Sequence, residues 1–218
     1  MRRTIMLFAT LLLATLLSLS AAQATGGAMT GGAMMGGTEG TVETADGASI
    51  YYQMQGEGDP MLLIHGYPLN SGLFRDNVGP LSEQYQVITV DLRGFGQSTS
   101  PSEEGSIETY ATDVLAVMDE LGINQAIVGG MSMGGPIVFE MYRQAPERFS
   151  GMILNDTIDA AASPPEAGLW AGVAQQAEEM GVASLVDFLM PDMLTGETRM
   201  NQPELVEYLG SLMEEASQ

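Results

Sequence analysis

A glycine-rich stretch around one serine constrains the fold of this chain more than any other feature. Residues 129–135 read Gly-Gly-Met-Ser-Met-Gly-Gly, and they follow a short apolar stretch at 126–128. Pro136 comes next, at a position where the first turn of a helix tolerates proline. The pattern therefore predicts a strand that turns sharply into a helix at about 133–144, with Ser132 held in the turn.

The same residues form the pattern G-x-S-x-G, which is typical of a nucleophile elbow. Gly130 and Gly134 lie two residues before and after Ser132, where small residues let the strand and the helix approach closely. Such a turn presents the serine hydroxyl as a nucleophile, but a hydroxyl attacks poorly without a base. The base is usually a histidine further along the chain. The chain has one histidine, His65, and it precedes the serine.

The charge of the chain narrows the classes of partner. Its formal charge is −21 at pH 7 over 218 residues, and a strongly acidic protein lacks the basic surface that nucleic-acid binding requires. The acidic side chains more simply form a solvated surface. They show no calcium-loop spacing, so we expect no metal site among them. We also expect no cofactor.

The first 24 residues have the pattern of a secretory signal peptide. Two arginines precede an apolar run over 5–17, and Ala22-Gln23-Ala24 fits a small-x-small cleavage site. The pattern predicts a secreted or periplasmic protein without membrane contact after cleavage; an uncleaved anchor is the alternative. Residues 25–40 are rich in glycine and methionine and are expected to be a flexible linker.

The rest of the chain alternates between expected strands and helices. We expect strands at 41–44, 48–55, 61–64, 86–90, 126–128 and 149–154, and helices at 71–85, 106–121 and 133–144. Short, fully apolar strands between helices indicate a mostly parallel sheet with helices on both faces, here a core over 41–157. Residues 158–218 form the second predicted unit, a helical lid whose helices over 164–217 break at Pro191 and near Pro203.

Four segments resemble the α/β-hydrolase fold family, in the family's order. They are LLIHGYP (62–68), VDLRGFGQS (90–98), GGMSMGG (129–135) and YRQAPERFSGMILNDT (142–157). Within the family the chain is most similar to esterases and lactone hydrolases of the 3-oxoadipate enol-lactonase kind. The resemblance implies an α/β-hydrolase core with a partial helical lid.

The resemblance also implies roles for individual residues. Ser132 is expected to attack an acyl carbonyl, and the backbone N–H groups of Met133 and Tyr67 to bind the oxyanion that results. His65 and Gly66 are expected to support the oxyanion loop, and His65 is not expected to be the base.

Several other positions leave alternatives open. Asp156 follows the strand after the elbow and is either the acid of a catalytic triad or a residue that caps its loop. Asp91 and Arg93 are expected to form an internal ion pair in a structural turn, in which Ser98 also takes part. Trp170 either shapes an apolar substrate pocket or packs between helices.

The resemblance stops inside the lid, which in the family is followed by two more strands that carry the acid and the catalytic histidine. We therefore expect a fragment of a serine hydrolase that cleaves small carboxylic esters or lactones, inactive on its own. The strand at 149–154 would then be an exposed apolar edge that invites aggregation. The alternatives are a haloperoxidase or iminopeptidase activity and a non-catalytic binding protein. A haloalkane dehalogenase is disfavoured, because its nucleophile is an aspartate and position 132 is serine.

Overall fold

The computed structural model describes residues 37–101, 105–159 and 163–216. The predicted signal peptide (1–24) and the predicted linker up to residue 36 lie outside the described residues. The first strand, β1 (Thr38–Glu43), begins before the expected core boundary at 41, because Thr38 to Gly40 already pair with the next strand. No helix in the described part of the chain is long and apolar enough to span a bilayer.

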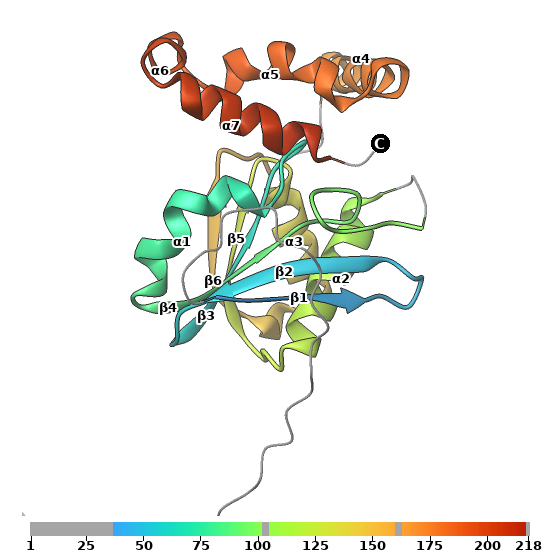
Figure 1. Cartoon of the computed structure of the whole chain (residues 1–218). Coiled ribbons are helices and arrows are strands. Elements are labelled where there is room, and N and C mark those ends of the chain that lie inside the picture. Colours follow the sequence, from blue (N-terminus) through green and yellow to red (C-terminus); the bar gives the residue numbers. More distant parts are fainter. Residues whose placement is uncertain (1–36, 102–104, 160–162, 217–218) are drawn as a thin grey trace, which may run out of the picture. The chain divides into compact units, whose positions relative to one another are not determined.

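A mixed six-stranded sheet forms the centre of the fold (Figure 1). Its order is β1-β2-β4-β3-β5-β6, with β2 at Ser49–Gln55, β3 at Asp59–Ile64, β4 at Tyr85–Val90, β5 at Ala126–Met131 and β6 at Phe149–Asn155. β1, β2 and β4 pair antiparallel, whereas β4, β3, β5 and β6 are parallel. The mostly parallel sheet predicted from the sequence is confirmed.

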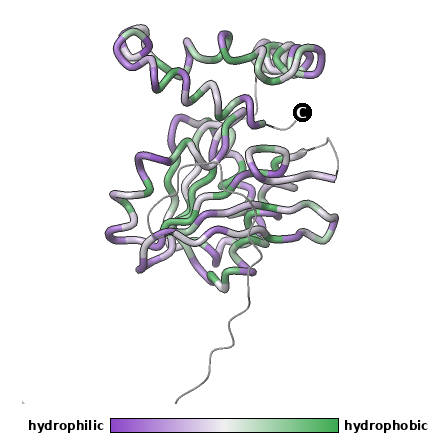
Figure 2. Tube along the Cα trace, viewed as in Figure 1, coloured by the Kyte–Doolittle hydropathy of each residue, from purple (hydrophilic) through white to green (hydrophobic). Residues whose placement is uncertain are grey.

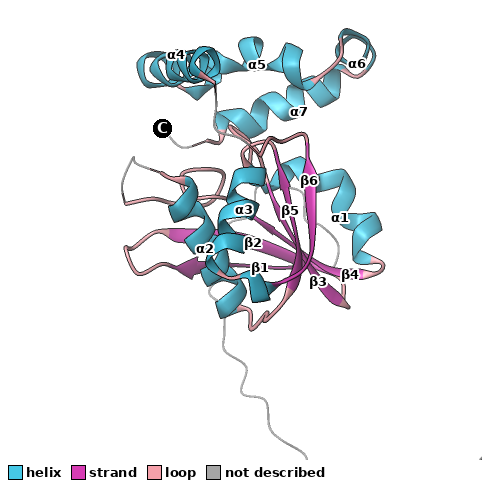
Figure 3. Ribbon diagram, turned by 180° about the vertical axis from the view of Figure 1, so that it is seen from behind, coloured by secondary structure: helices cyan, strands magenta, loops and turns pink. Residues whose placement is uncertain are grey.

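Helices cover both faces of the sheet, as Figures 1 and 3 show from opposite sides. α2 (Ile107–Glu120) and α3 (Gly134–Gln144) pack together on one face, and α1 (Arg75–Ser82) packs against the other. The single helix predicted over 71–85 is wrong in part. A 3-10 turn, η1 (Ser71–Phe74), precedes α1 because the Asn70 side chain caps Gly72 N–H, and Tyr85 already belongs to β4.

The core lies on both sides of the central strands, which are the apolar green segments in Figure 2. In β3, Leu62 and Ile64 face the α2 and α3 side, whereas Met61 and Leu63 belong to a smaller cluster with Val78 of α1. These four residues of β3 are buried, so this part of the strand has no solvent face. Burial of both faces explains why the strand reads as a continuous apolar run.

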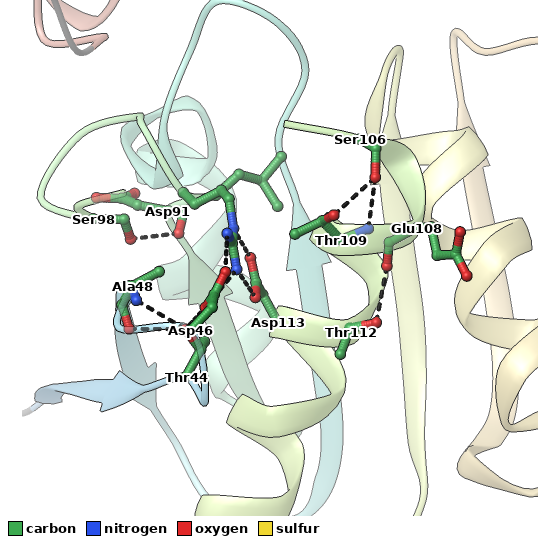
Figure 4. A network of polar contacts seen from close by, with 12 residues as sticks. Thr44, Asp46, Ala48, Asp91, Ser98, Ser106, Glu108, Thr109, Thr112 and Asp113 are labelled. Atoms are coloured by element: carbon green, nitrogen blue, oxygen red, sulfur yellow. Dashed lines mark hydrogen bonds and ion pairs between the residues drawn. The ribbon is translucent and has the colours of Figure 1, made fainter. Parts of the chain in front are cut away.

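Arg93 does not pair with Asp91, so the predicted internal ion pair is wrong. The guanidinium contacts Asp113 of α2 at 2.6 Å and Asp46 of the β1–β2 turn at 2.7 Å (Figure 4). These carboxylates raise the pKa of Arg93, mainly through the Asp113 hydrogen bond. Asp91 instead accepts the backbone N–H groups of Gln97 in its own loop and of Ser71 at the start of η1.

The lid consists of four α-helices and one 3-10 turn. They are α4 (Pro164–Met180), η3 (Val182–Leu185), α5 (Val186–Met193), α6 (Gly196–Asn201) and α7 (Pro203–Glu214). The helix start near Pro203 is confirmed, but the break at Pro191 is wrong, because α5 continues through it. Proline costs α5 one backbone hydrogen bond, and burial of Leu189 and Met190 offsets that loss.

Polar contacts attach α7 to the segment after β3. The Tyr208 hydroxyl donates to the Gly72 carbonyl at 2.8 Å, and the Arg75 guanidinium lies 3.8 Å from the centre of the Tyr208 ring. The Asn70 amide donates to the Glu215 carboxylate at 2.8 Å. The lid is therefore held next to the loop that, by the family resemblance, contains the oxyanion site.

β6 is an open edge of the sheet. In the described part of the chain it pairs only with β5, and Met152, Ile153 and Leu154 are 37%, 42% and 44% exposed. The apolar edge predicted at 149–154 is confirmed. Unpaired backbone groups beside apolar side chains favour pairing with other chains.

We predict that Ile153→Lys raises the soluble fraction of the expressed chain, because lysine on an edge strand opposes edge-to-edge pairing. The measurement is the soluble yield together with light scattering of the purified protein. Met200→Lys is the control, since Met200 is 77% exposed in α6, away from the sheet. An equal improvement in both variants would show that added charge, not the edge, governs solubility.

Candidate active site

Ser132 occupies a strained turn between β5 and α3. Its φ is 50°, a left-handed conformation that costs free energy in a residue other than glycine, and the residue is exposed. Its N–H donates to the Asn155 carbonyl at 3.1 Å, and its carbonyl accepts from Gly135 N–H at 2.9 Å and from the Thr157 hydroxyl at 2.7 Å. These bonds from β6 and α3 maintain the strained conformation and leave the Ser132 side chain at the surface.

The two flanking glycines are required by close backbone contacts. A Cβ on Gly134 would lie 2.5 Å from the Ile64 carbonyl oxygen of β3, and a Cβ on Gly130 would collide with the Gly134 carbonyl. No larger residue fits without moving backbone. The first turn of α3 is therefore packed directly against the ends of β3 and β5.

The loop after β3 lies against the serine. A Cβ on Gly66 would be 3.0 Å from Ser132 Cβ and 3.6 Å from its Oγ. The backbone N–H groups of Tyr67 and Met133 donate to no other described residue. Met133 also begins α3, and free N–H groups at a helix N-terminus favour negative charge. The arrangement can bind an anionic oxygen beside the hydroxyl.

His65 is fully buried below this loop, with both ring nitrogens engaged. Its Nε2 accepts Leu92 N–H at 3.0 Å, so Nδ1 carries the proton and donates to the Gly66 carbonyl at 3.0 Å. Desolvation lowers the pKa of His65. A neutral imidazole with no free nitrogen is suited to hold two loops together and not to accept a proton from Ser132.

Sequence reasoning missed three residues that build the site. The carbonyl of Asn155 and the hydroxyl of Thr157 hold the serine backbone, and the Phe95 ring packs edge-on against His65 at 5.4 Å between centroids. The Asn-Asp-Thr sequence at the end of an apolar strand was a usable signal for the first two.

The predicted role of Ser98 is confirmed, since its hydroxyl accepts Tyr51 N–H and donates to the Asp91 carbonyl.

Asp156 follows β6 and has a φ of 46°. Its carboxylate accepts no hydrogen bond from another described residue, so the loop-capping alternative lacks the bond that it requires. It lines an open cavity of about 370 Å³ with Phe139, Leu154 and the residues Thr157 to Asp159. The side chain is thus available at the same end of the sheet as Ser132.

Comparisons with known proteins agree with this geometry. The alpha/beta hydrolase fold family matches residues 59–187, which is more than half of the chain. The chain therefore belongs to the α/β-hydrolase fold family. Its structure is similar to a thermophilic esterase from Thermogutta terrifontis, at 28% identity and a TM-score of 0.77, covering 82% of this chain and 67% of that one.

Two curated relatives show how widely activities vary among similar chains. A 3-oxoadipate enol-lactonase of Acinetobacter baylyi is 32% identical over 76% of this chain and 62% of its own length. A putative non-heme chloroperoxidase of Synechocystis sp. is 30% identical over 73% of this chain and 63% of its own length. The chain thus spans less than two thirds of the length of these relatives.

We predict that Ser132→Gly is more stable than Ser132→Ala by about 1 kcal/mol, because only glycine adopts positive φ without a steric cost. Chemical denaturation of both variants measures the difference. Ser211, in the last turn of helix α7, is the control position, and there the alanine variant should be the more stable one. Equal stability of the two position-132 variants would contradict a strained turn.

We predict that the chain loses stability when the pH falls from about 7.5 to about 5. Burial lowers the pKa of His65 in the folded state, so the unfolded chain binds the proton first, from about pH 6.5 downward. The free energy of unfolding should fall by up to about 1.4 kcal/mol per pH unit in this window. His65→Gln, measured by denaturation at each pH, should lack this component. The same slope in both proteins would contradict a buried neutral imidazole.

Proposed function

We propose that this chain carries the nucleophile and oxyanion site of a serine hydrolase that cleaves carboxylic esters or lactones through an acyl-enzyme. One observation carries the proposal: an exposed serine is held at positive φ beside two backbone N–H groups without a described partner. Esterase and enol-lactonase structures among the similar proteins support it.

The proposed reaction has two steps. Ser132 Oγ attacks the carbonyl carbon, and the N–H groups of Tyr67 and Met133 bind the oxygen as it becomes negative. Each such donor is worth roughly 3 kcal/mol in the transition state of hydrolases. A base takes the hydroxyl proton and gives it to the departing alcohol oxygen as the tetrahedral species collapses to an acyl ester on the serine. The alcohol leaves from an ester but stays attached to the acyl chain of a lactone, and water then hydrolyses the acyl ester. The scheme uses no metal and no cofactor.

We propose that the catalytic base comes from polypeptide beyond these 218 residues. The only histidine of the chain is His65, and its two nitrogens already bond to Leu92 and Gly66. Asp156 is then the candidate acid, since its free carboxylate lies one residue after β6. On this proposal the 218-residue chain is a fragment and has no turnover by itself. The apolar N-terminal segment directs the protein to secretion or the periplasm.

The chloroperoxidase relative supports a second candidate, a cofactor-free haloperoxidase that uses the same serine. The two candidates differ in the molecule that attacks the acyl-enzyme, which is water in one case and hydrogen peroxide in the other. Halide oxidation in the presence of peroxide and a short carboxylic acid separates them.

We predict that the source DNA continues in frame past the codon for Gln218, and that the extended protein hydrolyses p-nitrophenyl acetate and a γ-lactone while the 218-residue chain does not. Ser132→Ala in the extended protein should lower kcat by roughly 10⁴-fold or more. Ser211→Ala is the control, because this serine lies in α7, outside the proposed site. An immediate stop codon would favour a binding protein, and activity that survives Ser132→Ala would exclude this mechanism.

A further inference from the structure

Three aromatic side chains form a row from the core to the lid. The Tyr67 ring lies between Phe95, at 6.0 Å between centroids, and Trp170 of α4, at 6.4 Å, and it is perpendicular to both. Phe95 is buried, whereas the Trp170 indole is 44% exposed. Tyr67 is thus held edge-to-face on its core side, and the lid side of the row is open to solvent.

The row begins next to the serine. Gly66 is the residue whose Cβ would touch Ser132, and Tyr67 follows it in the chain. The Tyr67 ring therefore connects the segment beside Ser132 with Trp170 of the lid.

Trp170 is not a buried residue of the lid. The lid cluster around Leu185 and Met213 includes Val173 of α4 but not Trp170, and the core cluster does not include it either. Its described ring contact is with Tyr67. Ligand sites are lined mostly by apolar and aromatic side chains, and a half-exposed aromatic pair offers such a lining.

The polar tips of the two rings are also unused. No hydrogen bond joins the Tyr67 hydroxyl or the Trp170 indole N–H to another described residue. Burial raises the pKa of Tyr67, so its hydroxyl stays protonated at neutral pH. The pair therefore offers apolar ring surface and two donors to the same ligand.

We propose that Tyr67 and Trp170 form a subsite for a planar aromatic group of the ester or lactone whose carbonyl lies at Ser132. The placement of the carbonyl rests on the proposed function. An aryl ring gains from stacking on the indole and from an edge contact with Tyr67, whereas a cyclohexyl ring of similar size only fills the space. The subsite therefore distinguishes aromatic from saturated substituents.

The test is ligand binding by the full chain carrying Ser132→Ala, which removes turnover. Trp170 is the only tryptophan, so its fluorescence reports directly on the subsite. Two matched pairs are titrated: methyl phenylacetate against methyl cyclohexylacetate, and benzyl acetate against cyclohexylmethyl acetate. In at least one pair we expect saturable fluorescence change and about fivefold tighter binding of the aryl ester, the gain of one aromatic pair.

Side-chain variants separate the subsite from general lid packing. Tyr67→Leu keeps the backbone N–H but removes the edge contact, so it should lower the aryl preference. Phe188→Leu should leave the preference unchanged, because Phe188 has the same 44% exposure but lies in α5. Equal binding of aryl and cyclohexyl esters in both pairs, or an undiminished preference in Tyr67→Leu, would overturn the proposal. The binding test does not depend on catalysis. If the aryl esters bind as expected but the extended protein hydrolyses no ester, the subsite is supported and only the proposed function is rejected.

Discussion

The close approach of the first turn of α3 to the ends of β3 and β5 organises the whole site. Gly134 packs on the Ile64 carbonyl, and Gly130 packs on Gly134, so the turn between strand and helix has no room to relax. Ser132 is consequently held at positive φ, and its backbone is bonded from Asn155 and Thr157. The backbone conformation of Ser132 and the position of the α3 N-terminus beside it both follow from this backbone contact.

A buried neutral histidine holds two loops, those after β3 and β4, in place beside that turn. His65 bonds to Gly66 on one side and to Leu92 on the other, and the Phe95 ring packs against its imidazole. Full burial favours the uncharged ring, and an uncharged ring with both nitrogens bonded is rigid. The same bonds that make His65 a good support make it a poor base.

The described residues combine a tightly held serine turn with an open edge of the sheet. β6 has a free edge with apolar side chains, and the chain spans less than two thirds of the two curated relatives described above. The side of Ser132 that faces the lid is held by more contacts. α7 is hydrogen-bonded to the segment after β3, and the Trp170 ring contacts the Tyr67 ring. The described residues therefore hold Ser132 and the lid contacts together, and they contain no second histidine beside His65.

The sequence by itself determined most strands and helices and the α/β class of the fold. Apolar strand runs, the G-x-S-x-G turn and the order of four motifs predicted a mostly parallel sheet and the place of Ser132, because these signals are local. The sequence did not determine which side chains that are far apart along the chain contact one another. Arg93 pairs with Asp113 and Asp46 and not with its neighbour Asp91, and Trp170 meets Tyr67 across more than 100 residues of chain. Only the tertiary structure decides such contacts, because they depend on how helices and loops pack over the sheet and not on spacing along the chain.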